Sequence, residues 1–261
     1  MAAAGFTALW EFGAAPARQA EFELRYGPEG DWAQLFRRAP GYLGSELLRD
    51  GKDPLRYVTV DRWEGAEAWR VFRSRFAGEY ERLDREFEAL TTHEAPLAAV
   101  RTWQDDDRAP LVRQANNRKV WRNLKNRFPH PYTDADAAAW LALARTDPDR
   151  TGLAIEVEGA CAGGIGLVPL TDVHARCAHI GYWLGEPFWG RGIMTAVVRA
   201  VTNHALTAPG FLRLEAPVFA WNPASMRVLE KCGYVREGVL RKSVFKDGEV
   251  IDSVLYAKVV P

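Results

Sequence analysis

Cysteine is scarce in this chain of 261 residues, which has Cys161, Cys177 and Cys232. An odd number of widely spaced cysteines is typical of reduced thiols and argues against a disulfide framework. Histidine is also sparse: five are present, and only His174 and His179 stand close together. No pair has the spacing of zinc ligands, so the sequence predicts no metal site.

Long apolar runs and an excess of one charge are missing as well. No uninterrupted apolar segment approaches the ~20 residues that a membrane-spanning helix needs. The first twelve residues lack a basic stretch and include Glu11, which argues against a secretory signal. Lysine plus arginine equals aspartate plus glutamate at 34 each, which argues against a surface built to bind nucleic acid. We therefore expect a cytoplasmic protein with neither membrane nor nucleic acid as partner.

The first hundred residues predict an α+β domain. Large apolar side chains alternate over Phe6–Phe12, which indicates a half-buried strand, and residues 17–38 read as helix with a break at 27–30. Further strands are expected at 42–48, 55–63 and 94–100. Before the last strand, one helix carries apolar side chains at three- and four-residue steps: Trp69, Phe72, Phe76, Tyr80, Leu83 and Phe87. Such a stripe is typical of a core or a dimer interface.

The pattern changes near residues 98–104, where we place the boundary between domains 1–100 and 101–261. Which domain owns the strand at 97–103 stays open. The second half predicts a basic helix at 107–126, a helix opened by a Thr133/Asp136 capping box, and Asn222 as another N-cap. The other predicted elements are strands at 152–158, 161–170, 177–184 and 212–221, a helix at 192–206, and a hairpin of 239–245 with 250–259.

One strand-to-helix turn stands out, because Gly190 and Gly192 flank Arg191 directly before the helix at 192–206. Glycines let the backbone approach an anion, and the free N–H groups of a first helical turn point at it. A diphosphate fits such a turn, although Gly-x-Gly also serves any tight connection. A dinucleotide fold is disfavoured because the third glycine is missing.

A second segment follows the next strand and includes Asn222-x-x-Ser225 and the Gly233-Tyr234 step at the helix end. With the glycine turn and Pro131-Tyr132-Thr133, it resembles the GCN5-related N-acetyltransferase (GNAT) superfamily, particularly its ribosomal-protein N-terminal acetyltransferase branch, over about residues 100–260. The resemblance implies a mixed α/β fold and direct transfer of acetyl from acetyl-CoA to a primary amine, without a metal. The resemblance leaves the acceptor open: a peptide N-terminus, or a small molecule such as an amino sugar, a polyamine or an antibiotic.

The resemblance also implies roles for individual residues. The CoA diphosphate would lie on Trp189, Gly190, Arg191, Gly192, Ile193, Met194 and Thr195, and the pantetheine arm beside Tyr182, Trp183 and Leu184. Asn222 would contact the cofactor, and Ser225 would protonate the departing thiolate. Glu215 is one candidate for the base that removes the amine proton, and a chain of water molecules is the other.

Each of these roles has an alternative. Trp189 and Met194 depart from the polar and small residues usual in the family, which affects cofactor orientation more than backbone binding. Asn222 also caps a helix, Ser225 also reads as a surface residue, and Glu215 as a structural one. The basic residues 113–127 form a solvated face or attract an acidic acceptor or the CoA 3′-phosphate.

Residues 5–97 resemble the antibiotic-biosynthesis monooxygenases, a ferredoxin-like α+β barrel family that commonly dimerises. The resemblance rests on Phe6–Phe12, Pro40–Gly44, Arg56–Trp63 and the aromatic helix. Because His93 is the single histidine of this half, a haem site is disfavoured. We expect a homodimerisation or small-ligand module. The rivals to acetyl transfer are oxygenase activity here and a non-catalytic acyl-CoA sensor.

Overall fold

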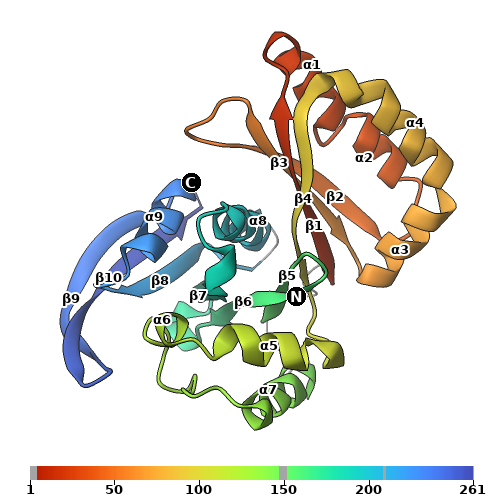
Figure 1. Ribbon diagram of the computed structural model, residues 1–261. Coiled ribbons are helices and arrows are strands. Elements are labelled where there is room, and N and C mark those ends of the chain that lie inside the picture. Colours follow the sequence, from red (N-terminus) through yellow and green to blue (C-terminus); the bar gives the residue numbers. More distant parts are fainter. Residues whose placement is uncertain (1–4, 147–151, 208–209, 261) are drawn as a thin grey trace. The chain divides into compact units, whose positions relative to one another are not determined.

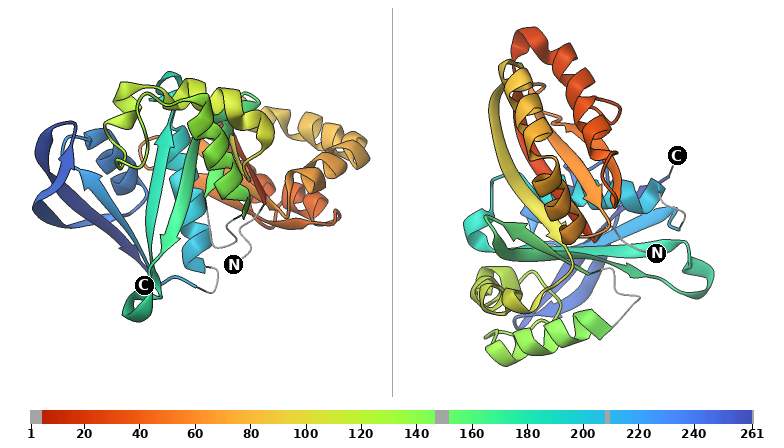
Figure 2. Two further views of the ribbon diagram at one scale, coloured as in Figure 1. Left: turned by 90° about the horizontal axis from the view of Figure 1, so that it is seen from below. Right: turned by 90° about the vertical axis from the view of Figure 1, so that its right-hand side faces the viewer.

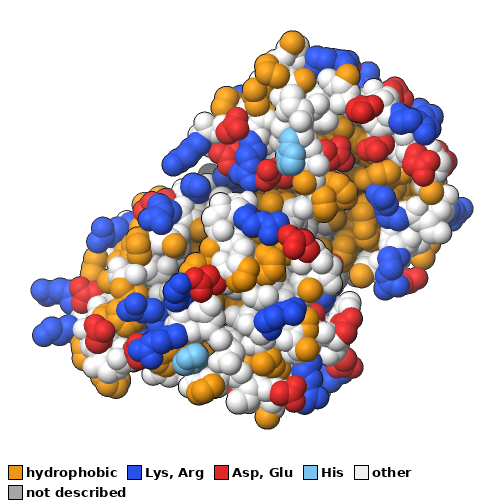
Figure 3. All heavy atoms as spheres, viewed as in Figure 1, with side chains coloured by type: hydrophobic (Ala, Val, Ile, Leu, Met, Phe, Trp, Pro, Cys, Tyr) orange, Lys and Arg blue, Asp and Glu red, His pale blue; other side chains and the backbone are white. Residues whose placement is uncertain are grey.

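A computed structural model describes residues 5–146, 152–207 and 210–260 (Figure 1). The chain forms two compact units, one ending at Thr102 and the other beginning at Trp103. Within the described residues, no helix combines the length and apolar character needed to cross a membrane. On the face seen in Figure 3, basic side chains are interspersed with acidic ones.

The N-terminal unit is built on four antiparallel strands in the order β2-β3-β1-β4. Their bounds are β1 Phe6–Ala14, β2 Tyr42–Arg49, β3 Arg56–Trp63 and β4 Thr91–Arg101. All four predicted strands are therefore confirmed. The ferredoxin-like α+β class follows from this sheet together with the helices packed on one of its faces.

Aromatic side chains form the core between this sheet and its helices. The helices are α1 Gln19–Tyr26, α2 Asp31–Phe36, α3 Ala66–Arg75 and α4 Ala77–Phe87, with short 3₁₀ turns at Pro16–Arg18 and Glu88–Leu90. Phe72 is fully buried and meets Phe36 edge to face, with ring centroids 5.1 Å apart. The predicted aromatic stripe is thus core, but the single helix predicted for it is wrong. Phe76 breaks it, because its backbone leaves the helical region (φ −108°, ψ 21°).

The C-terminal unit holds six strands in the order β5-β6-β7-β8-β10-β9. They are β5 Leu153–Val157, β6 Ala160–Pro169, β7 Cys177–Leu184, β8 Arg213–Phe219, β9 Val235–Lys246 and β10 Glu249–Val259. Neighbouring strands run antiparallel except β7 and β8, which are parallel. The carboxyl ends of β7 and β8 therefore lie at the same edge of the sheet.

Helices cover both faces of this sheet (Figures 1 and 2). On one face lie α5 Arg108–Ala115, α6 Arg118–Trp121 and α7 Asp134–Thr146, and on the other α8 Ile193–Thr207 and α9 Pro223–Lys231. Short 3₁₀ turns occupy Asp105–Asp107, Asp172–His174 and Glu186–Phe188. Together these elements make the mixed α/β fold that the sequence predicts.

Local capping explains where two of these helices begin. The Thr133/Asp136 capping box is confirmed, since the Thr133 N–H donates to the Asp136 carboxylate at 2.8 Å and the Asp136 N–H to Thr133 Oγ1 at 3.3 Å. The continuous basic helix predicted at 107–126 is wrong. α5 ends at Ala115, because the Asn116 backbone leaves the helical region (φ −76°, ψ 58°), and Asn117 caps α6 by accepting the Lys119 N–H at 2.8 Å.

Candidate active site

The central feature of the C-terminal unit is a fork between β7 and β8. Their parallel ladder has three pairs and ends at His179 with Glu215. Beyond it, in the described chain, residues 180–184 pair with β6 alone, while residues 216–219 pair with β10. One edge of β7 thus presents unpaired backbone groups, which an extended guest with amide groups can bind like an added strand.

A turn of bare amides lies at the carboxyl end of β7. Gly190 and Gly192 have φ of 78° and 80°, a region that favours glycine. In the described part of the chain, the N–H groups of residues 190–195 donate to no backbone carbonyl, and the first amide to do so is that of Ala196, to Gly192. Six donors therefore surround the start of α8, whose dipole also favours an anion.

The side chains of this turn have separate structural tasks. The Trp189 indole N–H donates to the Leu184 carbonyl at 2.7 Å and so fixes the turn to the end of β7. Arg191 Nη2 lies 2.9 Å from Glu158 Oε1, and the guanidinium stands over the Phe188 ring. Ile193 is buried. Met194 is half-buried, and the carbonyl of Thr195 accepts from the Cys232 thiol at 3.4 Å. The departures at Trp189 and Met194 therefore leave the backbone donors intact.

Successive side chains at the end of β7 point to opposite faces of the sheet. Trp183 packs edge to face on Phe128, with centroids 5.6 Å apart, in the segment between α6 and α7. Leu184 is buried. Tyr182 instead reaches α9, where its hydroxyl lies 2.9 Å from Ser225 Oγ. The sequence predicts only a backbone role for Tyr182 and does not reveal this side-chain contact.

Ser225 is placed by the start of α9. The Asn222 side chain accepts the Ser225 N–H at 3.2 Å, which confirms Asn222 as N-cap. Burial raises the pKa of the Tyr182 phenol, whereas its hydrogen bond with Ser225 lowers it. The phenol therefore keeps its proton at neutral pH, and Tyr182 and Ser225 form a pair of hydroxyls at the fork.

A charged network closes the narrow end of the fork. Glu215 Oε2 lies 3.3 Å from His179 Nε2 across the last rung, and Glu215 Oε1 accepts from Arg213 Nε at 2.6 Å. Arg213 Nη1 also donates to Glu237 Oε1 of β9 at 2.8 Å, across the intervening strand β10. Glu237 and Glu215 raise the pKa of the Arg213 guanidinium through these hydrogen bonds. The structure thus joins Glu215 to His179, for which the sequence alone predicts no role.

Several of the basic residues near the fork are already neutralised. Lys119 and Asn117 donate to Glu186 just ahead of the glycine turn, and the hydrogen bond from Lys119 lowers the pKa of Glu186. Arg118 pairs with Asp247 at 2.7 Å. These pairs tie α6 to the site edge, so the basic segment is only in part a solvated face.

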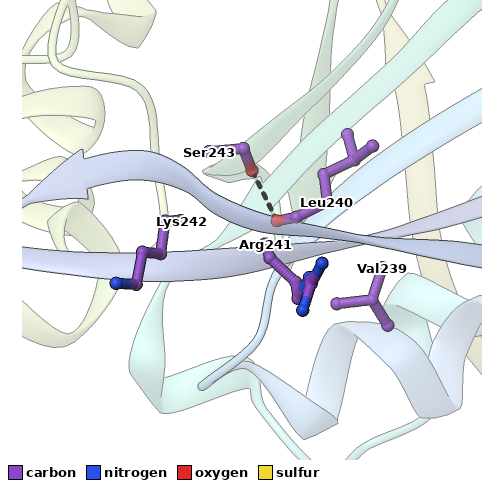
Figure 4. Close-up of a pocket in the computed structure, with 5 residues that line it drawn as sticks. All are labelled: Val239, Leu240, Arg241, Lys242 and Ser243. Atoms are coloured by element: carbon purple, nitrogen blue, oxygen red, sulfur yellow. Dashed lines mark hydrogen bonds between the residues drawn. The ribbon is translucent and has the colours of Figure 1, made fainter.

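Other chemistry-bearing features lie outside this arrangement. Burial raises the pKa of the Cys232 thiol to about 11, which suits a packed residue. Among the described residues, no group of three His, Cys, Asp or Glu side chains has a metal-binding arrangement. A hollow of about 680 Å³ on β9 is lined by residues 239–243 (Figure 4). It lies at a bulge that the hydrogen bond from Ser243 Oγ to the Leu240 carbonyl spans (2.9 Å).

Comparison with known proteins agrees with this geometry. Residues 99–235 match the model of the acetyltransferase (GNAT) domain, and residues 6–77 match that of the antibiotic biosynthesis monooxygenases. The uncharacterized N-acetyltransferase YoaA of Bacillus subtilis is 37% identical over 99 residues, 38% of this chain and 55% of that protein. The ribosomal-protein-serine acetyltransferase of Escherichia coli is 31% identical over 98 residues, which are 37% of this chain and 55% of that protein.

The chain therefore spans about half the length of these curated relatives. A solved ribosomal L7/L12 alpha-N-protein acetyltransferase in complex with coenzyme A superposes with a TM-score of 0.57 at 19% identity, over 64% of this chain and 96% of that one. This likeness shows the fold alone. The acetyltransferase model, however, covers more than half of the sequence. The chain belongs to the GNAT acetyltransferase family.

Proposed function

We propose that the C-terminal unit transfers an acetyl group from acetyl-CoA to a primary amine. The observation that carries this proposal is the open edge of β7 running directly into the turn of unpaired amides. Pantetheine carries amide groups at strand-like spacing and leads to a diphosphate. One molecule of acetyl-CoA therefore satisfies both the strand edge at residues 182–184 and the donors at 189–195.

The reaction proposed is direct attack of the neutral amine nitrogen on the thioester carbonyl. A C–N bond forms, the C–S bond breaks, and the thiolate takes a proton to leave as free CoA. We assign the donation of that proton to Ser225, and the Tyr182 hydroxyl, 2.9 Å from Ser225 Oγ, supports this assignment because it can replace the proton. Positioning of both reactants at the fork and backbone donors toward the developing oxyanion supply the remaining acceleration.

The amine must also lose a proton, since an alkylamine is mostly protonated near neutral pH. We assign this task to the pair of Glu215 and His179. Glu215 accepts a hydrogen bond from Arg213 and lies within reach of His179, so the two side chains can act together on the amine proton. His179 shares its face of the sheet with Trp183, opposite to the face of Tyr182 and Ser225. The proposed base and acid thus lie on opposite sides of the reacting carbonyl.

For the remaining assignments we propose the following. The acceptor is a peptide N-terminus or a small amine, as the name of the Escherichia coli relative suggests. The N-terminal unit serves as a homodimerisation module, in line with its family match. The protein is located in the cytoplasm, a reducing compartment that suits its three free cysteines. Sedimentation of the full chain at the mass of a dimer is the expected result for the module; a monomer at micromolar concentration contradicts it.

Thiol release tests the central proposal. We expect free CoA from acetyl-CoA with at least one member of a panel of amines and N-terminal peptides. Calorimetry on Gly192→Glu should detect no acetyl-CoA binding, because a carboxylate would meet the diphosphate. Gly248→Glu is the matched control, because Gly248 has the same φ of 80° in the β9–β10 turn, with open space around it.

Three outcomes discriminate among the functions. Binding that survives Gly192→Glu overturns the placement of the diphosphate. Binding by the wild type without thiol release from any acceptor identifies an acyl-CoA sensor. Oxygen uptake with quinol substrates and no thiol release assigns the activity to the N-terminal unit.

A further inference from the structure

We propose that the acceptor carries a carboxylate beside its amine, and that Arg122 binds this carboxylate at the wide end of the fork, with Lys246 behind it. This inference rests on the proposed function and names the substrate class of the same site. It is carried by two cations that, within the described residues, form no ion pair with a carboxylate, and by buried polar atoms beside them for which the same residues provide no hydrogen-bond partner.

Arg122 follows α6 and lies at the carboxyl end of β8. Its guanidinium stands over the Trp221 ring, 4.4 Å from the centroid, and Trp221 directly precedes Asn222, the N-cap of the helix that carries Ser225. In the described chain, no carboxylate lies within salt-bridge distance of Arg122. Stacking on an aromatic ring holds the planar guanidinium in place while leaving its N–H groups available for a carboxylate.

Lys246 adds a second cation from the end of β9. It is 1% exposed, with Nζ 3.7 Å from the Trp121 ring centroid and 3.2 Å from Asn126 Oδ1. Trp121 adjoins Arg122 in the chain. Both contacts are with neutral groups. Burial lowers the pKa of Lys246, although the adjacent Asp247 carboxylate, which pairs with Arg118, raises it. A buried ammonium without a carboxylate contact is costly unless an anion approaches it.

Three unpartnered polar atoms mark the same place. Arg122 Nε, Trp221 Nε1 and Asn123 Oδ1 are all buried and, within the described chain, have no hydrogen-bond partner. Two are N–H donors and one is a carbonyl acceptor. A carboxylate takes both donors, and a peptide or amine N–H takes the acceptor. Buried polar atoms are normally paired, so this set matches the polar groups of an acceptor that bears both functions.

The neighbouring cations provide an internal contrast. Arg118 is paired with Asp247 and Lys119 with Glu186, although both lie on the same short segment as Arg122. Only part of the basic segment is thus left for a ligand, and Arg118 serves as the matched control.

The position of Arg122 favours the acceptor over CoA as the source of the anion. The glycine turn starts α8, on one face of the sheet, whereas the segment after α6 belongs to the other face (Figures 1 and 2). The proposed base, His179, lies on that second face. A carboxylate bound by Arg122 therefore directs the acceptor amine to the side of the fork from which its proton is removed.

The test uses peptide acceptors matched in all but one charge, with aspartate or asparagine at the second, third or fourth residue. We expect the full chain to favour at least one aspartate peptide by about tenfold or more in kcat/KM, the value of a charge-assisted hydrogen-bond pair. Arg122→Gln should abolish this preference while acetylation of the asparagine peptide stays within about threefold. Arg122→Glu should instead favour a peptide that carries lysine at the position of the aspartate. Arg118→Gln should retain the wild-type preference for the aspartate peptide.

Each other outcome has a distinct meaning. Equal rates with aspartate and asparagine peptides in the wild type overturn the carboxylate site and leave acetyl transfer intact. Loss of affinity in Arg122→Gln for CoA but not for 3′-dephospho-CoA, measured by calorimetry, assigns Arg122 to the cofactor phosphate and also overturns it. Absence of thiol release with every acceptor defeats the proposed function itself.

Discussion

Replacement of Asp61 by asparagine tests the electrostatics of the N-terminal unit. Asp61 lies on β3, is 6% exposed, and accepts hydrogen bonds from Ser45 Oγ and from Thr59 Oγ1. Burial raises its pKa from 3.8 to about 6, although both hydroxyls lower it. This difference of about two pH units, at about 1.4 kcal/mol per unit, corresponds to ~3 kcal/mol.

The sign of this effect follows from proton linkage. The folded protein holds the Asp61 proton to higher pH than the unfolded chain, so stability is lost as pH rises from about 4 to about 6 and stays lost above that. Asparagine has nearly the same shape and no charge. We therefore expect Asp61→Asn to raise the free energy of unfolding by up to ~3 kcal/mol at pH 7 and by close to zero at pH 4.

Urea unfolding of the full chain at several pH values between 4 and 7 measures this difference. The transition that belongs to the N-terminal unit is the one to follow, because two units need not unfold together. A gain that is the same at pH 4 and pH 7, or an asparagine variant that is less stable at pH 7, would refute the reasoning. The first result assigns the effect to packing, and the second to a carboxylate that the site needs ionised.

Three further predictions concern the C-terminal unit. Ser225→Ala should lower kcat by about a hundredfold with acetyl-CoA affinity unchanged, and Tyr182→Phe by a smaller factor; equal turnover would make Ser225 a helix-surface residue without a catalytic role. His179→Gln should lower kcat/KM by about a hundredfold, whereas His174→Gln, at an exposed position, should leave it unchanged; equal kcat/KM in both variants would refute a role for His179 in proton removal. Trp189→Phe deletes the indole donor to Leu184 and should weaken acetyl-CoA binding, measured by calorimetry, about fivefold. An unchanged affinity would show that this hydrogen bond is not needed to hold the turn for cofactor binding.

Strands and turns of both units could be predicted because their signals are local. Alternation places every N-terminal strand to within a few residues, and glycine marks the positive φ values at 190 and 192. The break at Phe76 could not be predicted, since the apolar spacing continues across it from Phe72 to Tyr80. Likewise, the basic segment hides its break because Asn117 suits a helix surface as well as a cap.

The candidate site was predictable where a motif carries it and not where distant residues meet. The backbone donors and the Asn222 cap follow from spacing along the chain. By contrast, the contact of Tyr182 with Ser225 spans 43 residues, and that of His179 with Glu215 depends on the register of β7 against β8. Register is set by packing of the whole sheet, so a single sequence does not reveal which face each of these side chains takes.

The short ladder between β7 and β8 has a mechanical consequence. In the described residues, three residue pairs join strands β5, β6 and β7 to β8, β10 and β9, fewer than between any other two neighbouring strands of this six-stranded sheet. Amide hydrogen exchange in the unliganded protein should therefore be fastest along this ladder. A ligand that pairs with β7 and also contacts β8 connects the two halves of the sheet. Its binding should therefore slow amide exchange even in strands that it does not contact.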